Sequence, residues 1–413
     1  FRSDELRLFR DRLRIDIPVE DLIDADGLTP YYHPGFRSPE YEYLMERRRA
    51  LQGYLPERVE RSRTFVMPQA EVTASLMEGT GEKIQASTTM AFTRLLRQLM
   101  LAPEWGHRVV PIIPDEGRTF GMDGLFNDLK IYAPGGQRYE PVDAALLLSY
   151  REARNGRILE EGITEAGSMA SFTAAGTAYA TWGEPIIPFF IFYSMFGFQR
   201  VGDLIWAAAD SRTRGFLLGG TAGRTTLAGE GLQHQDGNSH VLALPVPNCL
   251  SYDPAFAFEL AVIIRDGIKR MYVDGESIFY YITVMNEQYA QPAMPKGADV
   301  EAGILKGLYL FKASADKKAK VRAQLLGSGT ILNEVVKVQE MLAGYGVAAD
   351  VWSATSYNEL YRDANDATRW NMLHPGEKAK VPYVTSCLAK TAGPVIAASD
   401  YLKSQPGMLA QFI

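Results

Sequence analysis

The chain has 413 residues, which is long enough for two or three domains with sizeable hydrophobic cores. It carries 43 Lys and Arg residues against 49 Asp and Glu residues, and the formal net charge of −6 gives no support for a nucleic-acid-binding protein. The longest strongly apolar stretch, residues 186–198, is interrupted by Pro188 and is too short to span a bilayer, so no membrane partner is expected.

The cysteines and the chain ends give two further expectations. Cys249 and Cys387 are the two cysteines, and both lie in apolar surroundings, which predicts buried thiols in a reducing, cytoplasmic compartment. Nothing in the sequence favours a bridge between them. The first residues are charged and contain no signal-peptide core. Because the chain starts with Phe1 instead of Met and stops abruptly at Ile413, both ends are expected to be cuts in a longer polypeptide.

Residues 1–66 are predicted to form a connector or an arm. The segment is rich in Arg and Glu and is dotted with Pro and Tyr. Short helices are expected at residues 4–14 and 41–51, on either side of a turn at residues 31–35. The segment contains no catalytic pattern, so it is expected to pack on another part of the protein.

Residues 67–290 are predicted to form an α/β domain with a doubly wound, mostly parallel sheet. Ser87 is expected to cap a helix that presents apolar side chains from Phe92 to Met100 on one face. Apolar strands then alternate with helices. The expected strands are residues 109–113, a strand that reaches Glu165, and residues 186–192, 216–218 and 278–284; the expected helices are residues 168–179, 202–209 and 255–266. In such sheets ligands bind beyond the carboxyl ends of the strands.

Residues 291–413 are predicted to form a second α/β unit, which begins after a polar hinge at residues 291–298. A strand at residues 324–329 turns into a helix at residues 331–342. Further strands are expected at residues 349–353 and 395–398. Two or three strands make a thin sheet, so this domain is expected to be incomplete and to continue past the last residue.

The candidate site combines one carboxylate with a row of aromatic rings. Residues 159–167 set Glu165 at the corner between a strand and a helix, and an aromatic run follows at residues 189–198. A carboxylate can hydrogen-bond one nitrogen of a flat ring while an aromatic side chain covers the ring face. Taken alone, Glu165 is most simply a helix-start residue, and the aromatic run is most simply a buried strand. Their occurrence in adjacent strands of one domain favours a site for a nitrogen-containing ring.

Two glycine-rich segments invite other interpretations. Residues 219–226 suggest a phosphate-binding loop, but the spacing is wrong and Arg224 stands where that motif requires Lys, so a flexible loop is the safer prediction. Residues 229–240 contain His234 and His240, whose spacing supports zinc binding only weakly. This segment is either a hydrogen-bonded loop at a domain edge or a functional loop, in which His234 donates a proton or binds a substrate carboxylate.

These features together resemble a known family. Glu165, the aromatic strand and the loop of residues 229–240 recur in this order in thiamine-dependent enzymes of the transketolase type. The similarity is sharper for one branch, the homodimeric-type pyruvate dehydrogenase, which is the acetyl-transferring, decarboxylating component of the bacterial pyruvate dehydrogenase complex. The segments that carry it span nearly the whole chain: IPDEGRTFGMDGLF (113–126), YSMFGFQR (193–200), GGT (219–221), NCLSYDP (248–254) and RWNMLHP (369–375).

The resemblance implies a pyrimidine-binding domain at residues 67–290, followed by part of a transketolase-like C-terminal domain at residues 291–413. In the family, a preceding domain carries a Gly-Asp-Gly motif and a downstream Asn, which hold Mg²⁺ and the diphosphate of the cofactor. Residues 265–267 and 273–275 lack the leading Gly of that motif. The ligands of Mg²⁺ and of the diphosphate are therefore expected outside this chain, and no metal ligand is expected within it.

The resemblance also implies roles for individual residues. Glu165 is expected to hydrogen-bond the aminopyrimidine of thiamine diphosphate, and Phe196 is expected to cover that ring. Tyr193 and His234 are expected to face the substrate, as catalytic groups together with Glu165. Transketolases have Arg-Glu-His where this chain has Thr-Glu-Ala at residues 164–166, which argues against sugar-phosphate chemistry and agrees with the pyruvate branch.

Three further acids and several partners follow from the same resemblance. Asp115 and Glu116 are expected to bind the cofactor at the edge that faces the dimer partner, and Glu230 is expected to order the loops over the site. The expected protein is a cytoplasmic homodimer that decarboxylates pyruvate and reductively acetylates the lipoyl group of a dihydrolipoyl acetyltransferase. The alternatives are another 2-oxo acid dehydrogenase, a transketolase-like enzyme, or a non-catalytic subunit that binds no cofactor alone.

Overall fold

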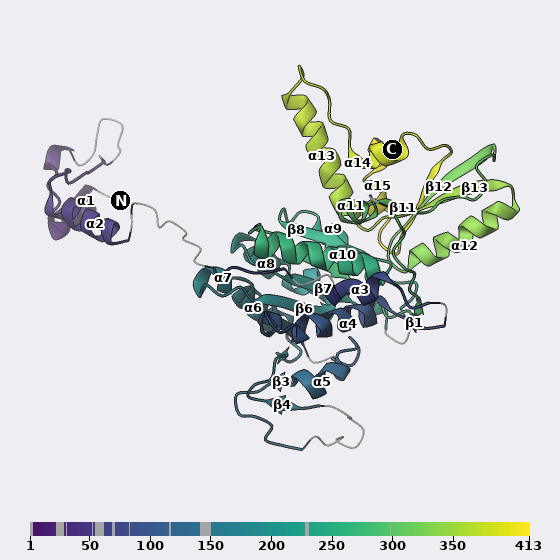
Figure 1. Ribbon diagram of the computed structural model, residues 1–413. Coiled ribbons are helices and arrows are strands. Elements are labelled where there is room, and N and C mark those ends of the chain that lie inside the picture. Colours follow the sequence, from purple (N-terminus) through teal and green to yellow (C-terminus); the bar gives the residue numbers. More distant parts are fainter. Residues whose placement is uncertain are drawn as a thin grey trace. The chain divides into compact units, whose positions relative to one another are not determined.

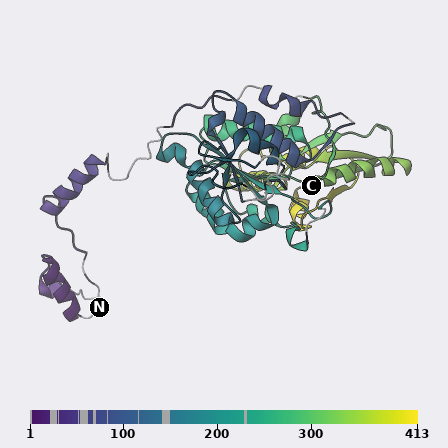
Figure 2. The same ribbon diagram turned by 90° about the horizontal axis from the view of Figure 1, so that it is seen from below.

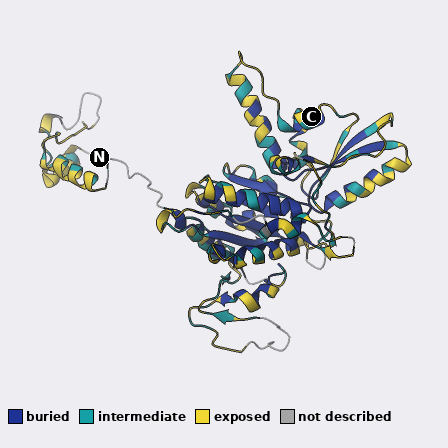
Figure 3. Ribbon diagram, in the orientation of Figure 1, coloured by how far each residue is buried: buried dark blue, intermediate teal, exposed yellow. Residues whose placement is uncertain are grey.

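The computed structural model describes residues 3–21, 29, 31–51, 53, 62–67, 71–81, 83–114, 117–140, 150–227, 231–297 and 299–413. They fall into two compact units, residues 1–60 and residues 61–413. The first unit contains α1 (Ser3–Leu13), η1 (Val19–Asp21) and α2 (Pro39–Ala50), and the hydroxyl of Ser38 caps α2. The two helices expected in this segment are therefore confirmed, and neither of them contains a buried residue (Figure 3).

The second unit is built around a six-stranded sheet in which every pair of neighbouring strands is parallel (Figure 1). In spatial order its strands are β5 (Leu159–Glu160), β2 (Val109–Ile113), β6 (Ile187–Tyr193), β7 (Phe216–Gly220), β9 (Phe279–Thr283) and β8 (Cys249–Tyr252). This sheet confirms the predicted α/β class and places the predicted strands side by side.

Helices cover both faces of this sheet, because its central strands are apolar on both sides. In β6, Phe189 and Ile191 belong to one core cluster, whereas Phe190 and Phe192 belong to another. Successive side chains of a strand point to opposite faces, so a continuous apolar run produces this two-sided burial. Figure 2 shows the strands between two helical layers. The layers contain α4 (Thr88–Leu101) and α10 (Ala257–Ile268) on one face, and α6 (Glu165–Gly176) and α8 (Gly197–Asp210) on the other.

Short elements complete the region around the sheet. Within the described ranges, no helix is both long enough and apolar enough to cross a membrane. The short elements are α3 (Glu71–Met77), β1 (Gln85–Ala86), η2 (Gly106–Arg108), α5 (Asp123–Leu129), β3 (Ile131–Tyr132), β4 (Glu152–Ala153), α7 (Ala178–Thr181), η3 (Ser194–Phe196), η4 (Leu232–His234), α9 (Ser239–Ala243), η5 (Lys269–Val273) and β10 (Tyr289–Ala290).

Three features of the sheet differ from the prediction. The strand before Glu165 and the aromatic strand were expected to be adjacent, but β2 lies between β5 and β6. The strand that was expected to reach Glu165 ends at Glu160, because the chain turns at Gly162, whose φ of +82° is incompatible with an extended strand. Glu165 is instead the first residue of α6. The edge strand β8, whose four residues directly follow a proline-containing turn, was not predicted.

The C-terminal part of the second unit contains a four-stranded sheet in the order β11 (Tyr309–Lys312), β13 (Val347–Ser353), β12 (Val321–Gly327) and β14 (Val395–Ala398). Its predicted strands and the helix α12 (Ile331–Gly344) are confirmed. The edge strand β11, which pairs antiparallel with β13, was not predicted. The helices around this sheet are α11 (Val300–Lys306), α13 (Tyr357–Leu373), α14 (Tyr383–Leu388), α15 (Ser404–Gly407) and η6 (Ala410–Phe412).

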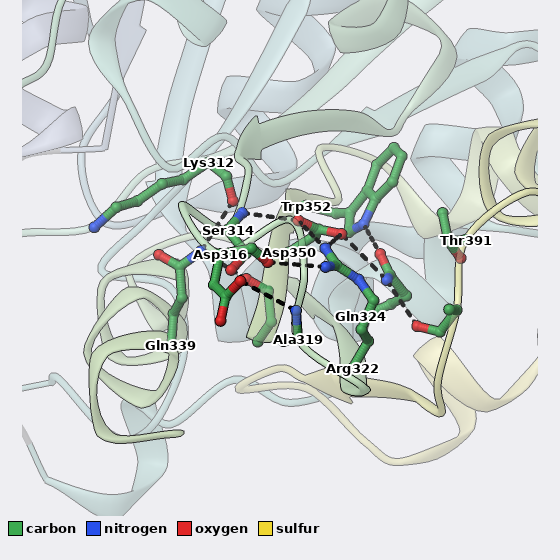
Figure 4. Close-up of polar contacts among 12 residues, drawn as sticks. Lys312, Ser314, Asp316, Ala319, Arg322, Gln324, Gln339, Asp350, Trp352 and Thr391 are labelled. Atoms are coloured by element: carbon green, nitrogen blue, oxygen red, sulfur yellow. Dashed lines mark hydrogen bonds and ion pairs between the residues drawn. The ribbon is translucent and has the colours of Figure 1, made fainter. Parts of the chain in front are cut away.

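Two acids, the half-buried Asp350 and the exposed Asp316, hold the loop that joins β11 to β12 (Figure 4). Asp350 on β13 accepts the backbone N–H of Ser314 at 2.8 Å. Asp316 accepts the N–H groups of Lys318 and Ala319 at 2.8 and 3.1 Å, which closes a turn within the loop. Both carboxylates thus stabilise this loop by accepting its backbone N–H groups.

A buried polar network joins the C-terminal part to the six-stranded sheet. Asp253, which follows β8, accepts the hydroxyl of Thr283 at 2.7 Å, and its backbone carbonyl accepts the N–H of Gly329 at 3.1 Å. Nε2 of His240 forms a hydrogen bond with the same hydroxyl of Thr283 at 3.0 Å. Burial raises the pKa of Asp253 to about 7 and lowers the pKa of His240 to about 4.

Asp253→Asn is expected to gain stability relative to the wild type as the pH rises from about 4 to about 7. The folded protein keeps the Asp253 proton up to about pH 7, whereas the unfolded chain loses it near the ordinary pKa of 3.8. Ionisation therefore favours unfolding across this window, and the free energy of unfolding of the wild type falls by roughly 4 kcal/mol through this one group. Urea unfolding of both proteins at several pH values measures the difference.

The comparison must be made as a difference between the two proteins. His240 contributes with the opposite sign, because its lowered pKa makes protonation at low pH favour the unfolded chain. Asp236 and Asp400 also lie near this network and are unchanged in the variant. Stability curves that run parallel between pH 4 and pH 7 would contradict the prediction.

Candidate functional site

The carboxyl ends of four neighbouring strands bring predicted site residues to one edge of the six-stranded sheet, together with Phe120, which was not predicted as one. The segments after β5, β2, β6 and β7 carry Glu165, Phe120, residues 194–200 and His234 respectively. Because these strands are parallel and adjacent, the segments that follow them gather on the same side of the sheet. The site is therefore assembled from positions spread over more than 110 residues of sequence.

Glu165 lies in the first turn of α6. The hydroxyl of Thr164 caps this helix by accepting the backbone N–H of Gly167 at 3.2 Å. The positive end of the helix dipole favours the negative charge of Glu165 at this position. The Glu165 side chain is 13% exposed, and its Oε1 accepts a hydrogen bond from Nη1 of Arg200 at 2.7 Å. The carboxylate is thus held by α8 from one side.

Four rings contact one another and form what we call the aromatic wall, which consists of Phe120, Tyr193, Phe196 and His234. The His234 ring centroid lies 4.6 Å from that of Tyr193 and 5.1 Å from that of Phe196. Tyr193 contacts Phe196 edge-on at 5.7 Å and Phe120 at 5.1 Å. The guanidinium carbon of Arg200 lies 4.0 Å from the Phe196 centroid, so Arg200 connects Glu165 to the wall.

Gly220, the last residue of β7, makes room for the aromatic wall. A Cβ atom at this position would lie 2.7 Å from the ring of Phe120, which is closer than van der Waals contact permits. A larger residue would push Phe120 out of its contact with Tyr193. The paired glycines that end β7 are therefore explained by packing behind the site, and not by a phosphate-binding loop.

His234 is the last residue of η4, and its ring completes the wall. Its Nδ1 is buried and has no hydrogen-bond partner among the described residues. A neutral imidazole has one nitrogen that donates a hydrogen bond and one that accepts. Such a nitrogen beside the wall is suited to contact a bound ligand.

Three of the predicted site residues cannot be placed in this geometry. Asp115, Glu116 and Glu230 lie outside the described residues, and their roles stay predictions. His240 has a different environment from His234, since its ring packs against Tyr401 with centroids 4.8 Å apart. Within the described segments, no group of three or more His, Cys, Asp or Glu side chains could hold a metal ion.

Arg200 was not predicted as a site residue. The signal for it was its spacing, because Arg200 follows Phe196, the residue that directly precedes α8, by four positions. What the sequence does not reveal is the ion pair with Glu165, which joins positions 35 residues apart. Arg200 thus contacts both the Glu165 carboxylate and the Phe196 ring, the two groups that were predicted to bind the same ligand.

The donor set of this site fits a flat heterocycle. Glu165 supplies an anionic acceptor, Phe196 supplies an apolar ring face, and His234 supplies a buried nitrogen that has no partner among the described side chains. Together these groups can hydrogen-bond the edge of a ring, cover its face and exchange a proton beside it. The described residues fit the aminopyrimidine part of thiamine diphosphate and offer no metal-binding cluster for its diphosphate.

Comparison with known families assigns most of the chain. The model described as the pyruvate dehydrogenase E1 component middle domain matches residues 68–292. The model described as the transketolase-like TK C-terminal domain matches residues 307–411. The two matches cover the six-stranded sheet and the four-stranded sheet respectively.

Curated relatives match along the whole length of this chain. A pyruvate dehydrogenase E1 component from Pseudomonas aeruginosa is 55% identical over 411 residues, which are 99% of this chain and 46% of the relative. Proteins of the same name from Mycolicibacterium smegmatis and Escherichia coli are 50% and 49% identical, over 99% and 97% of this chain and 44% of each relative. The chain thus spans less than half of the length of these relatives.

Solved structures agree with this result at the level of the fold. The transketolase of Campylobacter jejuni superposes with a TM-score of 0.57 at 15% identity, over 82% of this chain and 43% of that one. The transketolase of Leishmania mexicana gives a TM-score of 0.58 at 15% identity, over 81% of this chain and 41% of that one. At this identity the likeness shows a transketolase-like fold alone.

Proposed function

The chain belongs to the pyruvate dehydrogenase E1 component family, and we propose on this basis that it forms the pyrimidine-binding half of a thiamine diphosphate-dependent pyruvate dehydrogenase. One observation carries the assignment of the site: the carboxylate of Glu165 and the ring of Phe196, joined by Arg200, stand together at the carboxyl edge of the six-stranded sheet. In this proposal they hold the aminopyrimidine of the cofactor.

The residues of this chain then have separate tasks in the decarboxylation of pyruvate. When bound, thiamine diphosphate supplies the electron sink that cleavage of the bond to the carboxylate requires. Glu165 holds and exchanges a proton at the ring nitrogen that it hydrogen-bonds. Phe196 covers the ring face, while Tyr193 and His234 line the side where pyruvate reacts. His234 supplies or receives a proton there through its Nδ1, which hydrogen-bonds no group in the described part of the chain.

The proposed enzyme needs partners that this chain does not contain. A preceding half of the polypeptide holds the diphosphate and Mg²⁺, and the site lies between the two subunits of a homodimer. Asp115 and Glu116 bind the cofactor at the edge facing the partner, and Glu230 orders loops over the site. In the cytoplasm, the enzyme reductively acetylates the lipoyl group of a dihydrolipoyl acetyltransferase. The name E1 component, which the relatives carry, supports such a complex.

Ferricyanide reduction by the protein purified from its source tests this proposal. Pyruvate is expected to support turnover that requires both thiamine diphosphate and Mg²⁺, whereas 2-oxoglutarate is expected to support none. Turnover of 2-oxoglutarate would instead favour another 2-oxo acid dehydrogenase. Ketol transfer between sugar phosphates would favour a transketolase-like enzyme. Absence of turnover and of cofactor binding would favour the non-catalytic subunit.

Arg200→Met is expected to weaken thiamine diphosphate binding about tenfold, with a smaller effect on kcat. The change removes the ion pair with Glu165 and the contact with the Phe196 face, two interactions that are each worth about 0.5–1 kcal/mol at exposed positions. Calorimetric titration of the purified protein with thiamine diphosphate measures this affinity without turnover.

Two further variants make the result specific to Arg200. Arg200→Lys keeps the charge but loses the planar guanidinium, and is expected to bind the cofactor with intermediate affinity. Arg97 on α4 makes a comparable surface ion pair with Asp128 on α5 at 2.6 Å. Arg97→Met removes this pair and is expected to leave the cofactor affinity unchanged. Equal cofactor affinity in the Met variants of Arg200 and Arg97 would refute a role for Arg200.

A further inference from the structure

We propose that Asp400, on the C-terminal side of β14, is a positioning residue for the loop that carries His234. We call the described residues between β7 and α9, which are residues 221–227 and 231–238, the His234 loop. Asp400 belongs to the part of the chain that contains the four-stranded sheet, so one domain would hold the active-site loop of the other. The consequence for activity rests on the function proposed for His234.

The carboxylate of Asp400 binds the beginning of the His234 loop. Asp400 is only 4% exposed. Its Oδ2 accepts the backbone N–H of Arg224 at 2.9 Å and that of Thr225 at 3.0 Å. Its Oδ1 accepts the hydroxyl of Thr225. Three donors from two consecutive residues thus converge on one buried carboxylate, an arrangement of charge-assisted hydrogen bonds that fixes the backbone as well as the side chain.

The residues next to Asp400 bind both ends of the same loop. The Arg224 side chain donates from Nε to the backbone carbonyl of Asp400 at 2.7 Å and from Nη2 to that of Tyr401 at 3.3 Å. At the other end, the N–H of Leu402 donates to the carbonyl of Gly237 at 3.0 Å. Residues 400–402 therefore hold the His234 loop at two points that are 13 positions apart in the sequence.

Contacts within the loop carry this anchorage toward the site. The N–H of Asp236 donates to the carbonyl of Gly223 at 3.0 Å, which closes the loop at its base. The Asp236 carboxylate accepts the N–H groups of Asn238 and Ser239, each at 2.9 Å, and so fixes the start of α9. In the sequence, His234 lies between Arg224 and Gly237, the two positions at which residues 400–402 bind the loop, and its ring packs against Tyr193 of the aromatic wall. Displacement of the base would move the imidazole, and small displacements of reacting groups are costly in catalysis.

The first experiment measures the loop itself and does not depend on activity. In Asp400→Ala, amide hydrogen exchange at residues 222–227 and 231–238 is expected to be at least tenfold faster than in the wild type, while exchange in α10 is unchanged. Thr225→Val, which removes the hydroxyl donor and leaves the backbone intact, is expected to produce a smaller increase in the same peptides. Asp316→Ala is the matched control, because Asp316 also accepts two backbone N–H groups but lies in the loop between β11 and β12.

The second experiment measures the consequence for the reaction in the complete enzyme. Asp400→Ala is expected to lower kcat for pyruvate about tenfold while thiamine diphosphate affinity is retained, because Glu165 and Phe196 are untouched. Asp400→Asn keeps one acceptor oxygen and is expected to recover part of the loss. In a double-mutant cycle, Asp400→Asn and Thr225→Val are expected to be less than additive, because both remove the same contact.

The two readouts separate failure of this inference from failure of the proposed function. Faster loop exchange in a protein that never turns over pyruvate would support the anchorage and contradict the proposed activity. Unchanged exchange in Asp400→Ala would overturn the inference, whatever the activity. A parallel loss of exchange protection in α10, or of cofactor affinity, would also overturn it, since it would show general destabilisation instead of local release of the loop.

Discussion

Glu165→Gln in the complete enzyme is expected to lower kcat for pyruvate by about 100- to 10,000-fold, the range that loss of a general acid–base group produces. Gln has the same shape and can still hydrogen-bond Arg200, but its amide cannot take up and return a proton. Cofactor affinity is expected to fall less than kcat, because Phe196 remains in place. Pyruvate-dependent ferricyanide reduction gives kcat, and calorimetric titration gives the affinity for thiamine diphosphate.

The control for this variant is the same change at a position that touches neither the site nor the joint between domains. Glu334→Gln on α12 removes a surface ion pair with Lys337 and is expected to leave kcat unchanged. The thermal unfolding midpoint of both variants checks that any loss arises in the folded enzyme. Full activity in Glu165→Gln would remove Glu165 from the mechanism and with it the main support for the pyrimidine site.

The fold could be predicted to the extent that single strands and helices carry their own signal. Buried parallel strands such as β6 are continuous apolar runs bounded by turns, and they stand out in the sequence. The helix α4 follows a capping serine, whose hydroxyl accepts the N–H of Met90. Not every short edge strand carries such a signal. β11 has one buried residue among its four and pairs antiparallel with a strand that follows it by 35 residues, so only tertiary contacts define it.

The candidate site also has a part that could be predicted from local sequence and a part that could not. Glu165 and the aromatic run are local patterns, and a family resemblance gave them a role that the residues alone did not. The ion pair from Arg200 to Glu165 and the bonds from Asp400 to the His234 loop join positions 35 and 176 residues apart. A pairing at that separation leaves no periodicity or spacing in one sequence. Polar contacts of this kind are set by which strand ends meet at the sheet edge, which the chain order does not specify.

The joint between the two sheets depends on a second acid that no sequence pattern marked. Glu259 lies in the first turn of α10 and is completely buried. Its Oε2 accepts the backbone N–H groups of Ala255 and Phe256 at 2.6 and 3.2 Å, which caps the helix. Its Oε1 accepts the hydroxyls of Tyr309 and Ser353, both at 2.6 Å, from the four-stranded sheet. Burial raises the pKa of Glu259, and these hydrogen bonds oppose the shift.

Glu259→Leu is therefore expected to destabilise the protein by about 4 kcal/mol or more, since it leaves four buried donors without an acceptor. Glu259→Gln keeps a similar shape and can both accept from the backbone and donate to the hydroxyls, so it is expected to cost less than about 1.5 kcal/mol. Glu301→Leu, which breaks a surface ion pair with Arg265 in the same region, is expected to cost under about 1 kcal/mol. Urea unfolding, followed by tryptophan fluorescence, orders the three variants. If Glu259→Leu proved as stable as Glu301→Leu, the buried carboxylate would not be what joins α10 to the four-stranded sheet.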